Sequence, residues 1–239
     1  MTVAERPSAG PDREGRAAAA PLGALSAFER GTVVAAGAGL SALCAGVMLA
    51  RHGAGEHGTR KLLRATARIS MALFCAAFSA GSLDQLLHSR QTRWMVRNRR
   101  HLGLGFAASQ AIHLAAIVRV FRVSEGPRSP VTPAVIAGGS IGYGFIVAMA
   151  ATSNDAAVRR LGAARWKRLH TTGGRYLLAT FLFDVLNGYL KNGRRADVYG
   201  PLAALPLATI ACRHLARRAG HAARPVSRGA RAGGVGDRG

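Results

Sequence analysis

The sequence predicts an all-α protein, an integral membrane bundle of six transmembrane helices. The chain has 239 residues, of which 49% are hydrophobic and 18% are charged, yet its formal net charge is +22. Its cationic residues cluster between long apolar runs, whereas a nucleic-acid-binding domain carries Lys and Arg along exposed faces. A helix of about 20 residues crosses about 30 Å of hydrocarbon and satisfies its own backbone. The expected partner is therefore the lipid bilayer, with no nucleic acid.

Six apolar runs account for the expected spans, and a basic tail follows the last of them. The runs are Gly31–Ala50, Ile69–Leu87, Leu102–Phe121, Ala134–Thr152, Thr171–Leu190 and Pro201–Cys212. The sixth is short, and we expect its two prolines to shorten or bend it. Residues 1–30 lack the apolar core of a cleavable signal, and residues 213–239 are rich in Arg and Gly. We expect both to be disordered tails around a transmembrane domain of residues 31–212.

The distribution of cations predicts the orientation of these spans. Most of the 33 Lys and Arg residues lie in the N-terminal tail, in the connections 88–101 and 153–170, and in the C-terminal tail. Cytoplasmic loops carry an excess of Lys and Arg. We therefore expect both termini on the cytoplasmic side of the plasma (inner) membrane.

The glycine-rich stretch 138–144 lies inside the fourth run. A phosphate-binding loop has to follow a strand and open a soluble helix, so Gly138 and Gly142 are better explained as a G-x-x-x-G contact between helices. We give Gly37, Gly39, Gly103 and Gly105 the same interpretation. No alternating strand and helix pattern lies outside the runs, so we expect no flavin or NAD(P) domain in this chain.

Five ionisable residues lie within the runs: Asp84, His113, Arg119, Arg175 and Asp184. Such residues are costly in a bilayer and are candidates for function. His113 is expected near the middle of the bilayer, where a neutral imidazole either ligates haem iron or hydrogen-bonds a neighbouring helix. The residues leave these two alternatives open. Arg119 and Asp184 are expected to form an ion pair if their spans are neighbours.

His170 lies at the cytoplasmic edge of the fifth run. Gly173 and Gly174 leave room for a flat ring beside it, and Arg175 pairs either with a haem propionate or with Asp84. A third histidine, His101, has about the depth of His170, but it lies about 120° around its helix from His113.

Two blocks of sequence carry a resemblance to a known family. In residues 97–117, R-R-x-L-G-L precedes a histidine, and in residues 150–170, T-S precedes R-L-G-x-x-x-W-x-x-L-H. Together they resemble the ferric reductase-like transmembrane family, in its branch of haem-binding membrane subunits of bacterial methionine-sulfoxide reductase systems. The matching residues are Arg99, Arg100, Leu102, Gly103, Leu104, His113, Thr152, Ser153, Arg160, Leu161, Gly162, Trp166, Leu169 and His170.

The resemblance covers residues 95–190 and implies a six-helix cytochrome that holds b-type haem, with His113 and His170 as iron ligands. Arg175 is the expected partner of a propionate. Family members carry another histidine deeper in the fifth span, where this chain has Phe183 and Asp184. The depths of the two remaining histidines differ by about 10 Å or more, which makes one undistorted haem between them awkward.

The function expected from this resemblance is a membrane b-type cytochrome that relays single electrons between a separate donor, a flavoprotein or quinol, and an acceptor. Such a chain is an oxidoreductase component without a catalytic acid or nucleophile of its own. The alternative is a haem-free membrane scaffold or partner subunit, which the missing histidine favours and the retained His113 and His170 count against. A third alternative is a small transporter that uses Asp84 and Asp184 as proton sites.

Overall fold

Every regular element that the structure describes is a helix, which confirms the predicted all-α class. The computed structural model describes residues 12–124, 132–191 and 196–222. Its helices are α1 (Asp12–His52), α2 (Glu56–Leu87), α3 (Arg90–Arg97), α4 (Arg99–Val123), α5 (Pro133–Ala151), α6 (Asp155–Leu161), α7 (Ala163–Lys191) and α8 (Ala196–Ala222).

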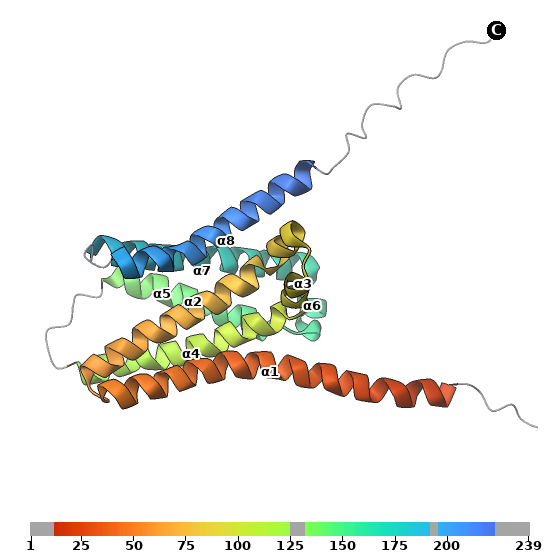
Figure 1. Cartoon of the computed structure of the whole chain (residues 1–239), viewed down its shortest axis with the longest axis horizontal. Coiled ribbons are helices and arrows are strands. Elements are labelled where there is room, and N and C mark those ends of the chain that lie inside the picture. The colour runs from red at the N-terminus through yellow and green to blue at the C-terminus, as the bar shows by residue number, and fades with distance from the viewer. Residues whose placement is uncertain (1–11, 125–131, 192–195, 223–239) are drawn as a thin grey trace, which may run out of the picture.

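Helix α2 is the centre of the bundle (Figure 1). It packs against α1 and α4 on one side and against α8 on the other, while α5 packs mainly on α7. The short helices α3 and α6 lie together at one end, which we call the α3–α6 end (Figure 1). The turn between α1 and α2 lies at the opposite end.

Four helices in the described ranges are long and apolar enough to cross a membrane. They are the Gly31–His52 part of α1, and α2, α4 and α5. Six spans are not confirmed, because α7 and α8 do not meet the same criterion of length and hydropathy within the residues described. In α7 the polar side chains of Thr171, Thr172, Arg175, Asp184 and Asn187 interrupt the apolar run.

Two helices extend beyond the runs from which they were expected. Helix α1 begins at Asp12, so its apolar segment is the second part of a longer helix. Helix α8 passes through Pro201 and Pro206 and ends at Ala222, so part of the expected basic tail is helical. Residues 1–11 and 223–239 of the expected tails lie outside the described residues.

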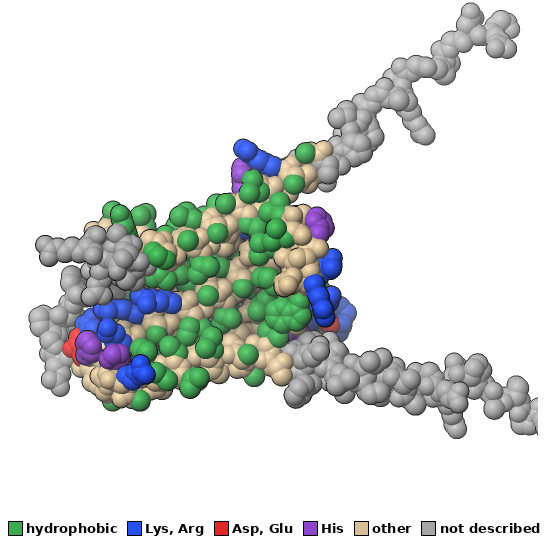
Figure 2. Space-filling model, viewed as in Figure 1, with side chains coloured by type: hydrophobic (Ala, Val, Ile, Leu, Met, Phe, Trp, Pro, Cys, Tyr) green, Lys and Arg blue, Asp and Glu red, His purple; other side chains and the backbone are tan. Residues whose placement is uncertain are grey.

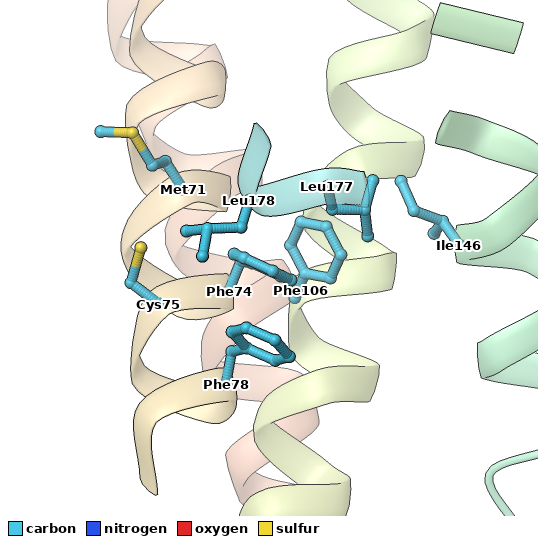
Figure 3. Close-up of a cluster of buried hydrophobic side chains, with 8 residues drawn as sticks. All are labelled: Met71, Phe74, Cys75, Phe78, Phe106, Ile146, Leu177 and Leu178. Atoms are coloured by element: carbon cyan, nitrogen blue, oxygen red, sulfur yellow. The ribbon is translucent and has the colours of Figure 1, made fainter. Parts of the chain in front are cut away.

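The core is built from apolar side chains of α2, α4, α5 and α7 (Figure 3). Phe74 of α2 stacks on Phe78, with 5.3 Å between ring centroids, and meets Phe106 of α4 at the same separation. Phe181 of α7 lies 5.4 Å from Phe74 and 6.2 Å from Phe106, again between centroids. Aromatic rings therefore fill the space between α4 and α7.

Glycines lie at two helix contacts, as the sequence predicts, but it is the pair Gly37 and Gly105 that brings two helix backbones close together. A Cβ atom on Gly37 of α1 would lie 3.1 Å from the Cα atom of Gly105 in α4. On α5, Gly138 and Gly142 both face Tyr176 of α7, whose hydroxyl donates a 2.8 Å hydrogen bond to the carbonyl oxygen of Gly138. Gly39 and Gly103 meet no such neighbour.

Charged and apolar side chains are segregated on the surface (Figure 2). On the face shown, hydrophobic side chains cover the length of the bundle, and Lys, Arg and His gather towards its two ends. This pattern is typical of a helical bundle whose middle lies in hydrocarbon and whose ends meet headgroups.

Candidate functional site

His113 is held between α4 and α2 by Thr66. Its Nδ1 atom lies 2.9 Å from the Thr66 hydroxyl, and that hydroxyl is 3.0 Å from the carbonyl oxygen of Leu62 and 3.1 Å from that of Leu63. A hydroxyl has one proton to donate. Because two carbonyl oxygens of its own helix lie within reach of the Thr66 hydroxyl, we infer that it donates to them and accepts from His113. In this arrangement the imidazole carries its proton on Nδ1, and its lone pair is on Nε2.

The contact belongs to a longer row of buried polar side chains, the polar seam, formed by Ser41, Thr66, Ser70, Ser109 and His113. The Ser109 hydroxyl of α4 lies 2.8 Å from that of Ser70 and 2.7 Å from that of Ser41. The Ser41 hydroxyl also donates to the carbonyl oxygen of Gly37. The seam thus joins α1, α2 and α4 through hydroxyl and imidazole groups.

His170 is held at the α3–α6 end, in a local contact that we call the α5–α7 clamp: Thr152, Trp166 and His170. The Trp166 indole donates a 3.0 Å hydrogen bond to the carbonyl oxygen of Thr152, at the end of α5. The imidazole of His170 stacks on the indole with 4.2 Å between centroids. Its Nε2 atom lies 3.2 Å from the Thr152 hydroxyl.

The same reasoning applies to the histidine of the α5–α7 clamp. The Thr152 hydroxyl lies 2.7 Å from the carbonyl oxygen of Ala148, so we infer that it donates there and accepts from Nε2–H of His170. Burial, together with the positive charge of Arg99 nearby, lowers the pKa of His170 from its ordinary value of 6.5. The nitrogen that most often ligates iron is therefore used to tie α7 to α5.

The two blocks that carry the family resemblance meet at this end. Arg100 in the first turn of α4 forms an ion pair with Asp155, the first residue of α6. The hydrogen bond from Arg100, and its charge, lower the pKa of that carboxyl group. Asn154 caps α6 by accepting from the backbone of Ala157 at 2.8 Å, and Gly162, with φ of 77°, allows the turn into α7.

The predicted ion pair between Arg119 and Asp184 is wrong. Arg119 lies on the face of α4 that meets the start of α2, where it donates to the carbonyl oxygen of Ala54 at 2.8 Å and to the Thr59 hydroxyl at 3.3 Å. Asp184 is on an exposed face of α7. Because α4 directs the Arg119 side chain towards α2, this side chain cannot also reach Asp184 on α7.

Asp84 does not pair with Arg175, as one sequence alternative proposed. Its carboxylate accepts a 2.8 Å hydrogen bond from the hydroxyl of Thr92, which forms a capping box with Ser89 at the start of α3. The carboxylate therefore fixes the turn between α2 and α3. Arg175 is exposed on α7, one residue after Gly174.

A single haem bridged by His113 and His170 does not fit this geometry. His170 is hydrogen-bonded to Thr152. Three residues after Thr152, Asp155 pairs with Arg100 in the first turn of α4. His170 therefore lies at the same level of the bundle as that turn. At 1.5 Å per residue, His113 is about 20 Å further along that helix. The axial ligands of one iron bind the same atom from opposite faces of the porphyrin. Between these two levels the interior is occupied by Phe74, Phe106 and Phe181.

Other potential metal ligands do not come together in the described ranges, where no three His, Cys, Asp or Glu side chains lie close enough to hold a metal ion.

Sequence analysis did not predict that Thr66, Thr152 and Trp166 are the partners of the two histidines. Thr66 and Ser70 are four residues apart on one apolar helix, as Ser109 and His113 are on another. Two such pairs on neighbouring antiparallel helices are a signal from which the polar seam could have been predicted.

Comparisons of the chain with protein-family models, with curated proteins and with solved structures found no match.

Proposed function

We propose that this chain is an integral membrane scaffold or partner subunit that holds no haem between its two motif histidines. One observation carries the proposal: each histidine is hydrogen-bonded to a threonine, at two levels of the bundle about 20 Å apart. Both side chains therefore have a structural role that needs no cofactor. Four long apolar helices support a location in the membrane.

We further propose that the α3–α6 end faces the cytoplasm, with both termini on that side. This end carries the cations of α3, α6 and the first turns of α4 and α7, including Arg93, Arg97 and Arg159. An excess of Lys and Arg marks the cytoplasmic side of a membrane protein. An Arg160→Cys variant, made in a chain without Cys44, Cys75 and Cys212, tests this orientation, because a membrane-impermeant thiol reagent added to sealed, inside-out vesicles labels only a cytoplasmic residue.

The second candidate function is the electron relay that the resemblance implies. The observation in its favour is the contact of His113 Nδ1 with the Thr66 hydroxyl, since a metal-bound histidine usually donates its other ring N–H to a neighbouring acceptor. Thr66 is such an acceptor. In this candidate His113 and His170 belong to different sites, and neither site has a second histidine from the deep part of α7, where Phe183 and Asp184 stand.

Absorption spectra of the protein, expressed with haem precursor and purified in detergent, distinguish the two functions. The structural proposal predicts no Soret band beyond that of a control membrane preparation. A dithionite-reduced α band typical of b haem, diminished in each of His113→Ala and His170→Ala and lost in the double variant, would establish the electron relay instead. Circular dichroism of each variant shows whether its bundle is still folded.

A further inference from the structure

Four arginines from three helices gather near the α3–α6 end without an acidic partner. They are Arg99 of α4, Arg175 of α7, and Arg213 and Arg217 of α8. The pKa of Arg213 is lowered, first by burial and then by the positive charges of Arg217, Arg99 and Arg175. The positive charges of Arg217, Arg99 and Arg175 therefore all act on Arg213.

Arg213 is fixed in place by α2. Its Nη1 atom donates a 2.9 Å hydrogen bond to the carbonyl oxygen of Phe78, and its guanidinium carbon lies 3.9 Å from the centre of the Phe78 ring. The same ring contacts Gly174 of α7, where an added Cβ atom would clash with the ring. Phe78 thus contacts both α7 and α8. It places Arg213 close to Gly174, the residue before Arg175.

The nearby carboxylates are already engaged elsewhere. Asp84 accepts from Thr92, and Asp155 pairs with Arg100. In the described part of the chain, none of the four arginines has a carboxylate within salt-bridge distance. Arg99, Arg175 and Arg217 are exposed, so their guanidinium groups are accessible to a ligand from outside the chain.

The guanidinium groups of these four arginines are chemically suited to bind a phosphate group. A guanidinium group presents paired N–H donors that match two phosphate oxygens, and uncompensated positive charge favours an anion. Basic pockets between transmembrane helices bind anionic headgroups at the cytoplasmic surface. One to two turns before Arg213, α8 exposes Leu207 and Ile210, which suit acyl chains.

We propose that Arg99, Arg175, Arg213 and Arg217 form a binding site for the phosphate of an anionic phospholipid headgroup. The lipid lies against α8, with its acyl chains along the exposed aliphatic side chains and its phosphate among the guanidinium groups. It neutralises their repulsion and so stabilises the contact of α8 with α2 and α7.

Thermal unfolding in lipid nanodiscs tests the proposal, with native mass spectrometry counting the retained lipids. We expect the unfolding midpoint to rise by several degrees in phosphatidylglycerol relative to phosphatidylcholine. The double variant Arg175→Gln, Arg217→Gln should lose most of that rise and retain fewer anionic lipids. It leaves the contact between Arg213 and Phe78 intact, so the bundle still folds.

The matched control is Arg165→Gln, Arg168→Gln, which removes the same charge from exposed positions at the start of α7. It should keep the full rise in phosphatidylglycerol. The proposal fails if the control loses as much of the rise as the test variant, or if the test variant keeps it. Inorganic phosphate added to phosphatidylcholine nanodiscs should give little shift, and an equal shift would overturn the assignment to a lipid.

Discussion

The polar seam and the α5–α7 clamp hold a histidine in the same way but in different surroundings. In both, a threonine donates its proton to a carbonyl of its own helix and accepts from the imidazole. Thr66 is fully buried and joins helices far apart in the sequence. Thr152 is only half-buried, and its partners come from the next long helix, at the end of the bundle.

This difference in burial indicates how much each contact contributes to the stability of the fold. A buried donor without a partner costs the free energy of its desolvation, whereas a donor near the surface finds water. We therefore expect the polar seam to be the more sensitive to a lost hydroxyl. The α5–α7 clamp should depend more on ring stacking and on the geometry of its turn.

The largest effect is expected for Thr66→Val, which keeps the shape of the side chain and removes the acceptor for His113. The imidazole of His113 then keeps only its hydrogen bond to the backbone of Leu63, and we expect the free energy of unfolding to fall by about 1 kcal/mol. Reversible unfolding in mixed micelles measures it. Thr66→Ser, which keeps the hydroxyl, is the matched control.

A double-mutant cycle with His113→Leu sharpens this prediction. Removing both polar groups of a pair costs less than the sum of the single changes, because no donor is left unsatisfied. Strictly additive effects would show that Thr66 and His113 do not interact.

A smaller effect is expected for Trp166→Phe in the α5–α7 clamp. The phenyl ring can still stack on His170, but the hydrogen bond to the carbonyl oxygen of Thr152 is lost. We expect a loss of about 1 kcal/mol or less, because the carbonyl is near water. A loss larger than that of Thr66→Val would contradict the comparison.

The lowered pKa of His170 in the α5–α7 clamp should make the protein less stable at acidic pH. As the pH falls below 6.5, the unfolded chain binds a proton at this residue before the folded one does, so stability decreases until the lower folded pKa is reached. The pH dependence of the unfolding midpoint between pH 7.5 and 5 should be shallower in His170→Gln than in the parent. Identical slopes would show that folding does not alter this titration.

The smallest effect is expected for Arg100→Gln at the α3–α6 end. Its partner Asp155 is exposed, and exposed ion pairs contribute little and are screened by salt. The unfolding midpoint should change less than in Trp166→Phe, and the difference should vanish in high salt. A large, salt-independent change would mean that the pair organises the end of the bundle.

Much of the fold could be predicted from the sequence because hydrophobic run length and charge position act locally. The all-α class and the packing of Gly138 and Gly142 against a helix are examples. The limits of α1 and α8 could not be predicted, because hydropathy marks where a helix is apolar and not where it ends.

The partners of the ionisable residues could not be predicted either, because they depend on which helix faces which. Arg119 was expected to meet Asp184 across two spans, but α4 turns it towards Thr59. For His113 the sequence left ligation and hydrogen bonding open, and the hydrogen bond required knowing that Thr66 lies opposite. The spacing of residues along one helix shows which face of that helix a side chain occupies. It does not show which other helix packs against that face.

The central claim is that His113 and His170 serve as hydrogen-bond donors to threonines, and ¹⁵N NMR of the histidine side chains tests it most directly. With haem supplied during expression, His113 should carry its proton on Nδ1 and His170 on Nε2, each resonance assigned by its His→Gln variant. Broadening or loss of both resonances in the oxidised sample, restored when haem synthesis is blocked, would show that the two imidazoles bind iron and would contradict the account.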